Sequence, residues 1–160
     1  MSLKYHIRQM QESDLQAVAQ LESECFSQPW KYDDFKDIIT NKWMNRVYFV
    51  AELAQLSEDG EKQIVGGCML TEVAGEGDIS NVAVSQIYRG NHIATKLLKD
   101  IMEFGTNEWN IRAYTLEVRS KNAPAIKLYE NAGFVSAGIR PGFYDKPKDD
   151  AIIMWKTVED

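Results

Sequence analysis

Apolar residues recur along the chain with two different periods, and each period predicts one kind of element. A spacing of three and four residues is typical of one face of a helix. It predicts helices after Ser13, over residues 31–39, over residues 93–105 and after Asn122. Alternating or β-branched apolar residues are typical of strands. They predict strands over residues 4–8, 46–53, 63–73, 79–84, 113–118, 134–139 and 150–158.

Residues that favour caps and turns separate these segments. Ser13 and Asn122 precede two helical patterns as N-cap residues, and Gly133 stands where a glycine is expected after a helix. Polar turns are predicted at residues 57–62 and 75–78. The order of elements is typical of a single α/β (α+β) domain over residues 1–160, built on one central sheet and without a linker.

Composition limits what this domain can be. Its 160 residues suffice for a core, and 44% hydrophobic and 26% charged residues are close to the globular average. The longest apolar runs are residues 47–51 and 151–155. They fall far short of the roughly 20 residues of a membrane span. Residues 1–9 lack the apolar stretch of a signal peptide, so we expect a cytoplasmic protein that does not bind membranes.

Charge, cysteine and histidine content exclude further classes. A net charge of −6 opposes direct binding to nucleic acid and favours a cationic partner. Cys25 and Cys68 lack the Cys-x-x-Cys spacing, so buried free thiols are expected. His6 and His92 have no partner at metal-ligand spacing, so we expect neither a metal site nor a Ser-His-Asp triad.

The first segment with chemical content joins the strand end at residues 81–84 to the helix that starts near Ile93. The first N–H groups of a helix have no intrahelical partner, and together with the helix dipole they attract phosphate oxygens. An ordinary strand-to-helix connection has the same pattern, and the residues alone leave both interpretations open. No Gly-Lys-Ser/Thr follows, which excludes a Walker loop, and Gly66-Gly67 lies within a predicted strand, which excludes a dinucleotide fingerprint.

The loop itself resembles the pyrophosphate loop of the GCN5-related N-acetyltransferases (GNAT), whose pattern is Gln/Arg-x-x-Gly-x-Gly/Ala. Arg89 matches the first position of this pattern and Ala94 the last. His92 stands where the central glycine is usual. This departure bears on how closely the backbone approaches the pyrophosphate, and His92 is explained either as a surface residue or as a phosphate contact.

Three further stretches resemble the RimI-type ribosomal-protein alanine N-acetyltransferases within this superfamily. They are the run over residues 115–134 with Leu-Glu-Val-Arg and Leu-Tyr, the Phe-x-x-Pro-Trp element at residues 26–30, and residues 140–144 with 150–154. The likeness covers nearly the whole chain. It implies a GNAT-like fold with a central mixed, mostly antiparallel sheet flanked by about four helices.

In that family the Glu of Leu-Glu-Val-Arg is the general base and the Tyr of Leu-Tyr the general acid, which implies these roles for Glu117 and Tyr129. Only a neutral amine attacks a thioester, so a proton must be accepted, and the departing thiolate needs a proton or a hydrogen bond. Without the resemblance, Glu117 also fits the solvent face of an edge strand, and Tyr129 also fits core packing beside Ala125 and Ile126.

The resemblance also implies acetyl-CoA as co-substrate and indicates where it binds. Backbone groups of the strand would hold the pantetheine arm and polarise the thioester carbonyl, and the loop would hold the pyrophosphate. Asn122 would lie near the CoA arm, and it is equally well explained as a helix N-cap. The implied cofactor-binding residues are Val82, Ala83, Val84, Arg89, Gly90, Asn91, His92, Ile93, Ala94, Asn122 and Tyr129.

The acceptor implied by the family is a basic protein N-terminus, beginning with alanine, of a small-subunit ribosomal protein. An α-amine has a pKa near 7.7–8.0 and lysine near 10.4, so at neutral pH the α-amine is the better nucleophile. Acidic residues would attract a basic tail or serve only solubility. They are Glu22, Glu24, Asp33, Asp34, Asp145, Asp149 and Asp150. Two other functions stay open at this point: acetylation of a small-molecule amine, and a non-catalytic CoA-binding module.

Overall fold

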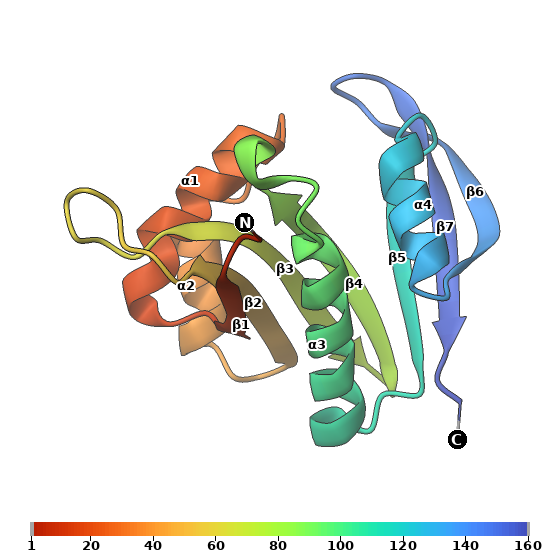
Figure 1. Cartoon of the computed structure of the whole chain (residues 1–160). Helices are drawn as coiled ribbons and strands as arrows, with labels where there is room; N and C mark the ends of the chain where they lie inside the picture. Colours follow the sequence, from red (N-terminus) through yellow and green to blue (C-terminus); the bar gives the residue numbers. More distant parts are fainter. Residues whose placement is uncertain (1, 160) are drawn as a thin grey trace.

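The structure, a computed structural model, describes residues 2–159. It contains seven strands and four α-helices in one α/β arrangement (Figure 1). The helices are α1 (Leu15–Cys25), α2 (Tyr32–Thr40), α3 (Ile93–Trp109) and α4 (Ala123–Asn131), with short 3₁₀ turns η1 (Glu12–Asp14) and η2 (Gln86–Tyr88). The strands are β1 (Tyr5–Gln9), β2 (Asn45–Leu53), β3 (Ile64–Val73), β4 (Glu76–Val84), β5 (Ala113–Arg119), β6 (Val135–Tyr144) and β7 (Asp149–Thr157).

All strands belong to one sheet, with the order β1-β2-β3-β4-β5-β7-β6. Every neighbouring pair is antiparallel except β4 and β5, which are parallel. The ladder between β4 and β5 runs from Glu76 opposite Ala113 to Ile79 opposite Leu116. Beyond these residues the two strands diverge (Figure 1). The predicted mixed, mostly antiparallel sheet is confirmed, and the divergence opens it near its centre.

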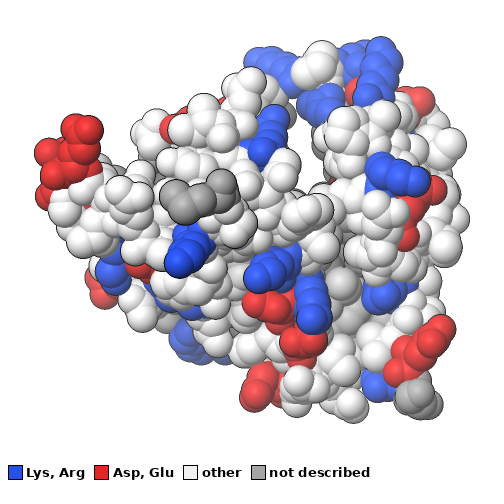
Figure 2. All heavy atoms as spheres, in the orientation of Figure 1, with Lys and Arg blue, Asp and Glu red and all other residues white. Residues whose placement is uncertain are grey.

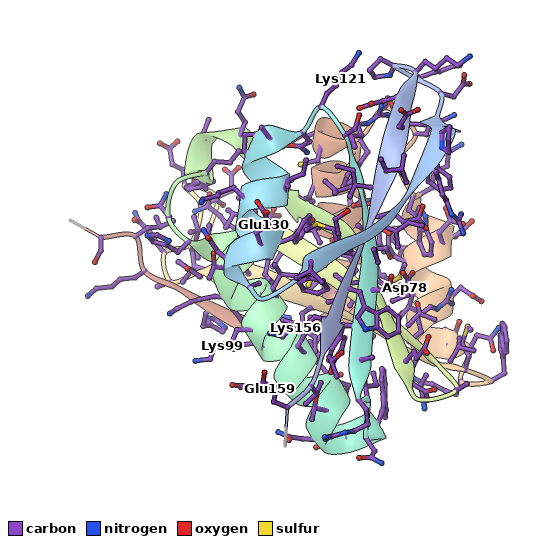
Figure 3. All side chains as sticks on the ribbon, turned by 90° about the vertical axis from the view of Figure 1, so that its right-hand side faces the viewer. Asp78, Lys99, Lys121, Glu130, Lys156 and Glu159 are labelled. Carbon is purple, nitrogen blue, oxygen red and sulfur yellow. The ribbon has the colours of Figure 1, made fainter. Side chains whose placement is uncertain are left out.

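Helices cover both faces of the sheet, because consecutive residues of its inner strands are apolar. Tyr48 and Val50 of β2 pack with Phe35 and other residues of α1 and α2. Phe49, between them, faces the opposite side and packs in the larger cluster that contains α3 and Tyr129 of α4. In Figure 3, α3 and α4 lie on one side of the sheet and α1 and α2 on the other. None of the helices within residues 2–159 combines the length and apolar character needed to cross a bilayer.

Most predicted elements are confirmed, but several boundaries were wrong. Ser13 lies inside η1 and is not a helix cap, because the Asp14 carboxylate accepts a hydrogen bond from the Gln11 amide (2.8 Å) and closes this turn. The helix predicted to end near Gly105 continues to Trp109. Gly105 is an interior residue at which a β-carbon would come within 2.8 Å of Leu70 and Tyr114. It is a point of close packing and not a helix end.

The turn predicted at residues 75–78 is shorter, and β4 accordingly begins at Glu76. Ala74 and Gly75 both have positive φ angles, 53° and 84°, which is the conformation of a two-residue hairpin turn. The predictions at the two ends of α4 are confirmed. Asn122 caps the helix, and Gly133, with φ 98°, follows its last turn. Both could be read from the sequence because the Asn122 carboxamide can cap a helix and Gly133, which has no β-carbon, adopts a positive φ without strain.

Candidate functional site

The opening between β4 and β5 begins where β4 changes its path. Its pairing with β3 shifts between Gly67 and Met69, opposite one extra residue of β4. Asn81 lies in this bulge, and its φ of 54° is in the left-handed region that asparagine tolerates better than most residues. Within the described chain, no strand pairs with the edge of residues 80–84 that faces β5. Polar backbone groups on that edge are therefore available to a ligand.

The loop before α3 also contains left-handed residues. Gly90 has φ 86°, and His92, the N-cap residue of α3, has φ 62°. Histidine adopts this conformation at some cost, whereas glycine adopts it freely. His92 thus follows the backbone path at the position where the pyrophosphate-loop pattern has glycine. No side chain among residues 2–159 caps the first turn of α3, so its N–H groups keep the anion-binding character predicted from the sequence.

Arg89 and Val84 contact each other at the end of β4. Nε of Arg89 donates a hydrogen bond to the carbonyl oxygen of Val84 (3.1 Å), and the Cys25 thiol donates to the same oxygen (3.5 Å). The Val84 carbonyl is therefore occupied by the protein itself. Only the remaining backbone groups of Val82, Ala83 and Val84 are left for the predicted contact with the pantetheine arm.

Asn91 and Ile93 attach the loop to the body of the molecule. The Asn91 side chain donates to the carbonyl oxygen of Tyr88 (2.8 Å), and the Asn91 carbonyl oxygen accepts from the Tyr5 hydroxyl (3.0 Å). The Ile93 side chain is buried in the main core. Gly90 beside them is exposed and Ala94 is half-buried. The contact of these loop residues with a phosphate stays a prediction.

Glu117 lies on β5, which is an inner strand between β4 and β7 and not an edge strand. It pairs with Ile153 of β7, and it comes directly after the last residue of β5 that pairs with β4. Its Oε1 lies 3.8 Å from a guanidinium nitrogen of Arg140. Its Oε2 is buried and has no hydrogen-bond partner among the described residues. The side chain as a whole is 30% exposed, so a substrate or a water molecule can reach it from solvent. An unpaired carboxylate oxygen in this setting is suited to accept a proton.

Asp78 is a second carboxylate near Glu117 that we did not predict. It pairs with Thr115 across β4 and β5. Thr115 and Glu117 are two residues apart on β5, so the side chains of Asp78 and Glu117 lie on the same face of the sheet. Burial, followed by repulsion from Glu117, raises the pKa of Asp78 to about 6. Asp78 lies near Glu117 because β4 and β5 pair in parallel, although α3 separates them along the chain. The sequence alone does not reveal this register.

Tyr129 is buried on α4, with 7% of its surface exposed. Its ring packs edge-on against Phe134, with the centroids 6.2 Å apart. Burial, with smaller contributions from Cys68 and Tyr144, raises the pKa of Tyr129. The hydroxyl therefore keeps its proton at neutral pH and acts as a hydrogen-bond donor more readily than as a full proton source.

Glu117 and Tyr129 lie on opposite sides of the sheet. Tyr114, Leu116 and Val118 alternate with Glu117 along β5 and point into the core that contains Tyr129. Glu117 consequently faces the side that carries α1 and α2. Figure 2 shows the surface hollowed at the top of the view, between the part that carries α3 and the part that carries α4. A reaction in the opening would have Glu117 on one side and Tyr129 on the other.

The Asn122 side chain is used as the N-cap of α4. Its Oδ1 accepts a hydrogen bond from the Ala125 amide (3.2 Å), so the capping interpretation is confirmed and the predicted contact with CoA stays a prediction. The two cysteines are free, as expected. Cys68 is fully buried, and Cys25 is only half-buried.

Two of the acidic residues expected to attract a basic tail cannot do so. Glu22 and Asp149 are buried, and Asp149 accepts hydrogen bonds from the Ser120 hydroxyl and the Lys121 amide. Asp34 and Asp150 are engaged locally by the amides of Lys31 and Gly142. Glu24, Asp33 and Asp145 remain exposed. In Figure 2, Lys and Arg side chains gather over the turn between β6 and β7.

This geometry can be compared with that of known proteins. A model of the Acetyltransferase (GNAT) family matches residues 15–134. The chain belongs to this GNAT acetyltransferase family. The prediction of the superfamily, made from the loop and the run over residues 115–134, is confirmed, and the membership implies acetyl-CoA as the co-substrate.

Three similar proteins extend this result. A Bacillus subtilis protein, named provisionally as a ribosomal protein bS18-alanine N-acetyltransferase, is 32% identical over the whole of both chains. The crystal structure of the ribosomal-protein-S18-alanine N-acetyltransferase from Escherichia coli matches with a TM-score of 0.78 and 26% identity, covering 98% of this chain and 95% of that one. Arabidopsis thaliana NAA60 in complex with a bisubstrate analogue shares the fold, with a TM-score of 0.85, 19% identity and coverage of 98% and 99%.

Within the described part of the chain, no group of three or more His, Cys, Asp or Glu side chains is arranged to hold a metal ion. The components predicted to serve acetyl transfer are the bulged β4, the N-terminus of α3, and the side chains of Glu117 and Tyr129.

Proposed function

We propose that this protein transfers the acetyl group of acetyl-CoA to the α-amine of a protein N-terminus, and that its acceptor is the N-terminal alanine of a small-subunit ribosomal protein. The observation that carries this proposal is the full-length relationship to the Bacillus subtilis protein, together with the match to the Escherichia coli enzyme over nearly the whole chain. Such an acceptor is made in the cytoplasm, where the reaction would take place.

In the proposed reaction the neutral amine attacks the thioester carbonyl carbon, and a C–N bond forms while the C–S bond breaks. Glu117 would accept the proton that the amine loses, directly or through water, at the carboxylate oxygen that lacks a partner. The departing thiolate would receive a hydrogen bond from Tyr129. Because burial raises the pKa of this phenol, the proton would be shared late in the reaction.

The donor would be held mainly by backbone groups. Those of residues 82–84 that remain free would bind the pantetheine arm and polarise the carbonyl. The first turn of α3 and the loop containing Arg89, Gly90 and His92 would bind the pyrophosphate. Asn122 would contact the CoA arm beside the start of α4.

An α-amine acceptor is also favoured by its acidity. At neutral pH the unprotonated fraction of an α-amine is about a hundredfold larger than that of a lysine side chain. A single carboxylate base therefore suffices for an α-amine. The same base would leave most lysine side chains protonated and unreactive.

The test is thiol release from acetyl-CoA with a panel of acceptors, followed by mass spectrometry of the products. The panel contains an Ala-Arg peptide, the same peptide with a blocked α-amine and a free lysine, and a polyamine. We expect release with the free α-amine only. Release with the polyamine alone would overturn the proposed acceptor in favour of a small-molecule amine. Binding without release on any acceptor would indicate a non-catalytic CoA-binding module.

A further inference from the structure

Glu22, in the last turn of α1, is a buried carboxylate that the proposed mechanism does not use. Its side chain has no solvent exposure. Its Oε1 accepts a hydrogen bond from Nδ2 of Asn81 (2.7 Å), and its Oε2 has no hydrogen-bond partner in the part of the chain that the structure describes. The backbone amide of Trp30 is a further polar contact of this carboxylate. Burying a carboxylate with so few partners is costly, so the presence of Glu22 here requires an explanation.

The partner of Glu22 is Asn81, and the shape of β4, the strand proposed to bind the acetyl donor, depends on this residue. Asn81 holds the left-handed φ of 54° in the bulge of β4, and the strand residues directly after it face the opening. Without a fixed side chain, this residue would relax toward an ordinary strand conformation, and the backbone groups that follow would turn. The contact with Glu22 opposes such a change.

A second contact from the same helix turn supports this interpretation. Cys25, three residues after Glu22 on α1, donates to the carbonyl oxygen of Val84 (3.5 Å). The last turn of α1 thus holds β4 at both ends of the segment that would bind the donor. α1 also packs against β3 and β4 and is therefore a firm support.

We propose that Glu22 is a positioning residue for acetyl transfer: its hydrogen bond to Asn81 fixes the left-handed turn of β4 and so aims the backbone groups of residues 82–84 at the thioester. This inference rests on the proposed function. It predicts an effect on turnover that exceeds the effect on acetyl-CoA affinity, because an aimed donor matters most when charge develops on the carbonyl oxygen.

The charge of Glu22 supplies a readout that a purely structural role would not change. Burial raises the pKa of Glu22 to about 7, and the contacts with Asn81 and the Trp30 amide oppose this rise only in part. The other titratable groups around this pocket are Cys25 on α1, Tyr48 on β2 and Cys68 on β3, with Glu24 and Arg89 near Cys25. A protonated Glu22 is a weaker acceptor for Asn81, so the hydrogen bond between these two side chains should weaken below pH 7.

The experiment compares Glu22→Gln, Asn81→Gly and the double variant with wild type, using acetyl-CoA and the Ala-Arg peptide. Glycine adopts the positive φ without strain, so Asn81→Gly removes the hydrogen bond to Glu22 while the fold is kept. We expect kcat to fall about tenfold for Glu22→Gln at pH 8.5, with a smaller rise, of about threefold, in KM for acetyl-CoA. The ratio of wild-type to Glu22→Gln turnover should approach one at pH 6, where both residues are neutral.

The double variant should be no slower than Asn81→Gly alone. Tyr48→Phe is the matched control. It changes a buried hydroxyl in the same pocket that has no partner within residues 2–159, and it should leave kcat unchanged. Multiplying losses in the double variant, or a turnover ratio independent of pH, would overturn the positioning role.

The role of Glu22 can be tested even if the proposed function is wrong. If wild type acetylates neither peptide nor amine, calorimetry with acetyl-CoA decides the role of Glu22 alone. Glu22→Gln and Asn81→Gly should then each weaken binding by about threefold, and together no more than Asn81→Gly. Unchanged affinity in both variants would contradict the inference.

Discussion

The two strands that border the opening, β4 and β5, are built in different ways. β4 is irregular: it contains a bulge at Asn81, and buried polar contacts to Glu22 and Cys25 hold it in place. β5 is regular, with buried apolar residues alternating with Thr115 and Glu117. From this difference we predict that β4 contributes backbone groups to the reaction and that β5 contributes a side chain. Substitutions on β4 should therefore act through conformation, and substitutions on β5 should act through chemistry.

The largest effect is expected on the β5 side, at Glu117. Glu117→Gln keeps the shape of the side chain and removes the proton acceptor, so kcat should fall by at least roughly 10²-fold. Steady-state thiol release with the Ala-Arg peptide measures this change. The exposed Glu130→Gln on α4 is the matched control and should leave kcat unchanged. A Glu117→Gln enzyme with the turnover and pH profile of wild type would make this residue structural.

Tyr129 tests the chemistry from the other side of the sheet. Tyr129→Phe keeps the ring packing against Phe134 and removes the hydroxyl, so kcat should fall roughly 10²-fold while the melting temperature changes little. Tyr114→Phe is the control. The Tyr114 hydroxyl donates to the Met102 carbonyl oxygen (2.6 Å), so its loss should cost about 1 kcal/mol of stability without affecting turnover. Full turnover in Tyr129→Phe would remove this residue from the mechanism.

The loop at the start of α3 is a second segment that, like β4, is predicted to act through its backbone conformation. His92→Gly keeps the positive φ and relieves the strain of a β-carbon there, so unfolding free energy should rise by about 1 kcal/mol. Acetyl-CoA affinity, measured by calorimetry, should stay the same or increase. Asn110→Gly, at a second left-handed position (φ 53°), should stabilise similarly without any change in affinity. A tenfold loss of affinity in His92→Gly alone would show that the imidazole contacts the donor.

The smallest effect is expected at Asp78, and it depends on pH. The pKa of its carboxyl rises from 3.8 to about 6 on folding, so the folded state binds more protons than the unfolded state between these values. The Asp78 contribution to stability is thus lost as pH rises through this window. Asp78→Asn should raise the melting temperature by roughly 2 °C at pH 8, and by less at pH 5. An equal gain at both values would exclude this titration as the cause.

Much of the fold could be predicted, because local chemistry determines it. The alternation over residues 113–118 and the caps Asn122 and Gly133 were readable directly from residue types. The bulge at Asn81 was not, since nothing near it in the sequence requires an extra residue. Its partner Glu22 lies 59 positions away along the chain.

Charge placement was the least predictable part of the site. Glu22 and Asp149 were grouped with surface acids, yet both are buried, because acidic residues give no local sign of the polar groups that will enclose them. Asp78 was not considered, because its position near Glu117 depends on the parallel pairing of β4 and β5. The roles of Glu117, Tyr129 and the donor-binding residues rest on resemblance and geometry, and they stay predictions until the variants are measured.

The most direct test of the central claim is mass spectrometry of an Ala-Arg peptide, with a free lysine in its sequence, after incubation with the enzyme and acetyl-CoA. The proposed function predicts one added acetyl group, which fragmentation assigns to the α-amine of the alanine. Acetyl groups on the lysine side chain, or an unmodified peptide beside an acetylated polyamine, would contradict it.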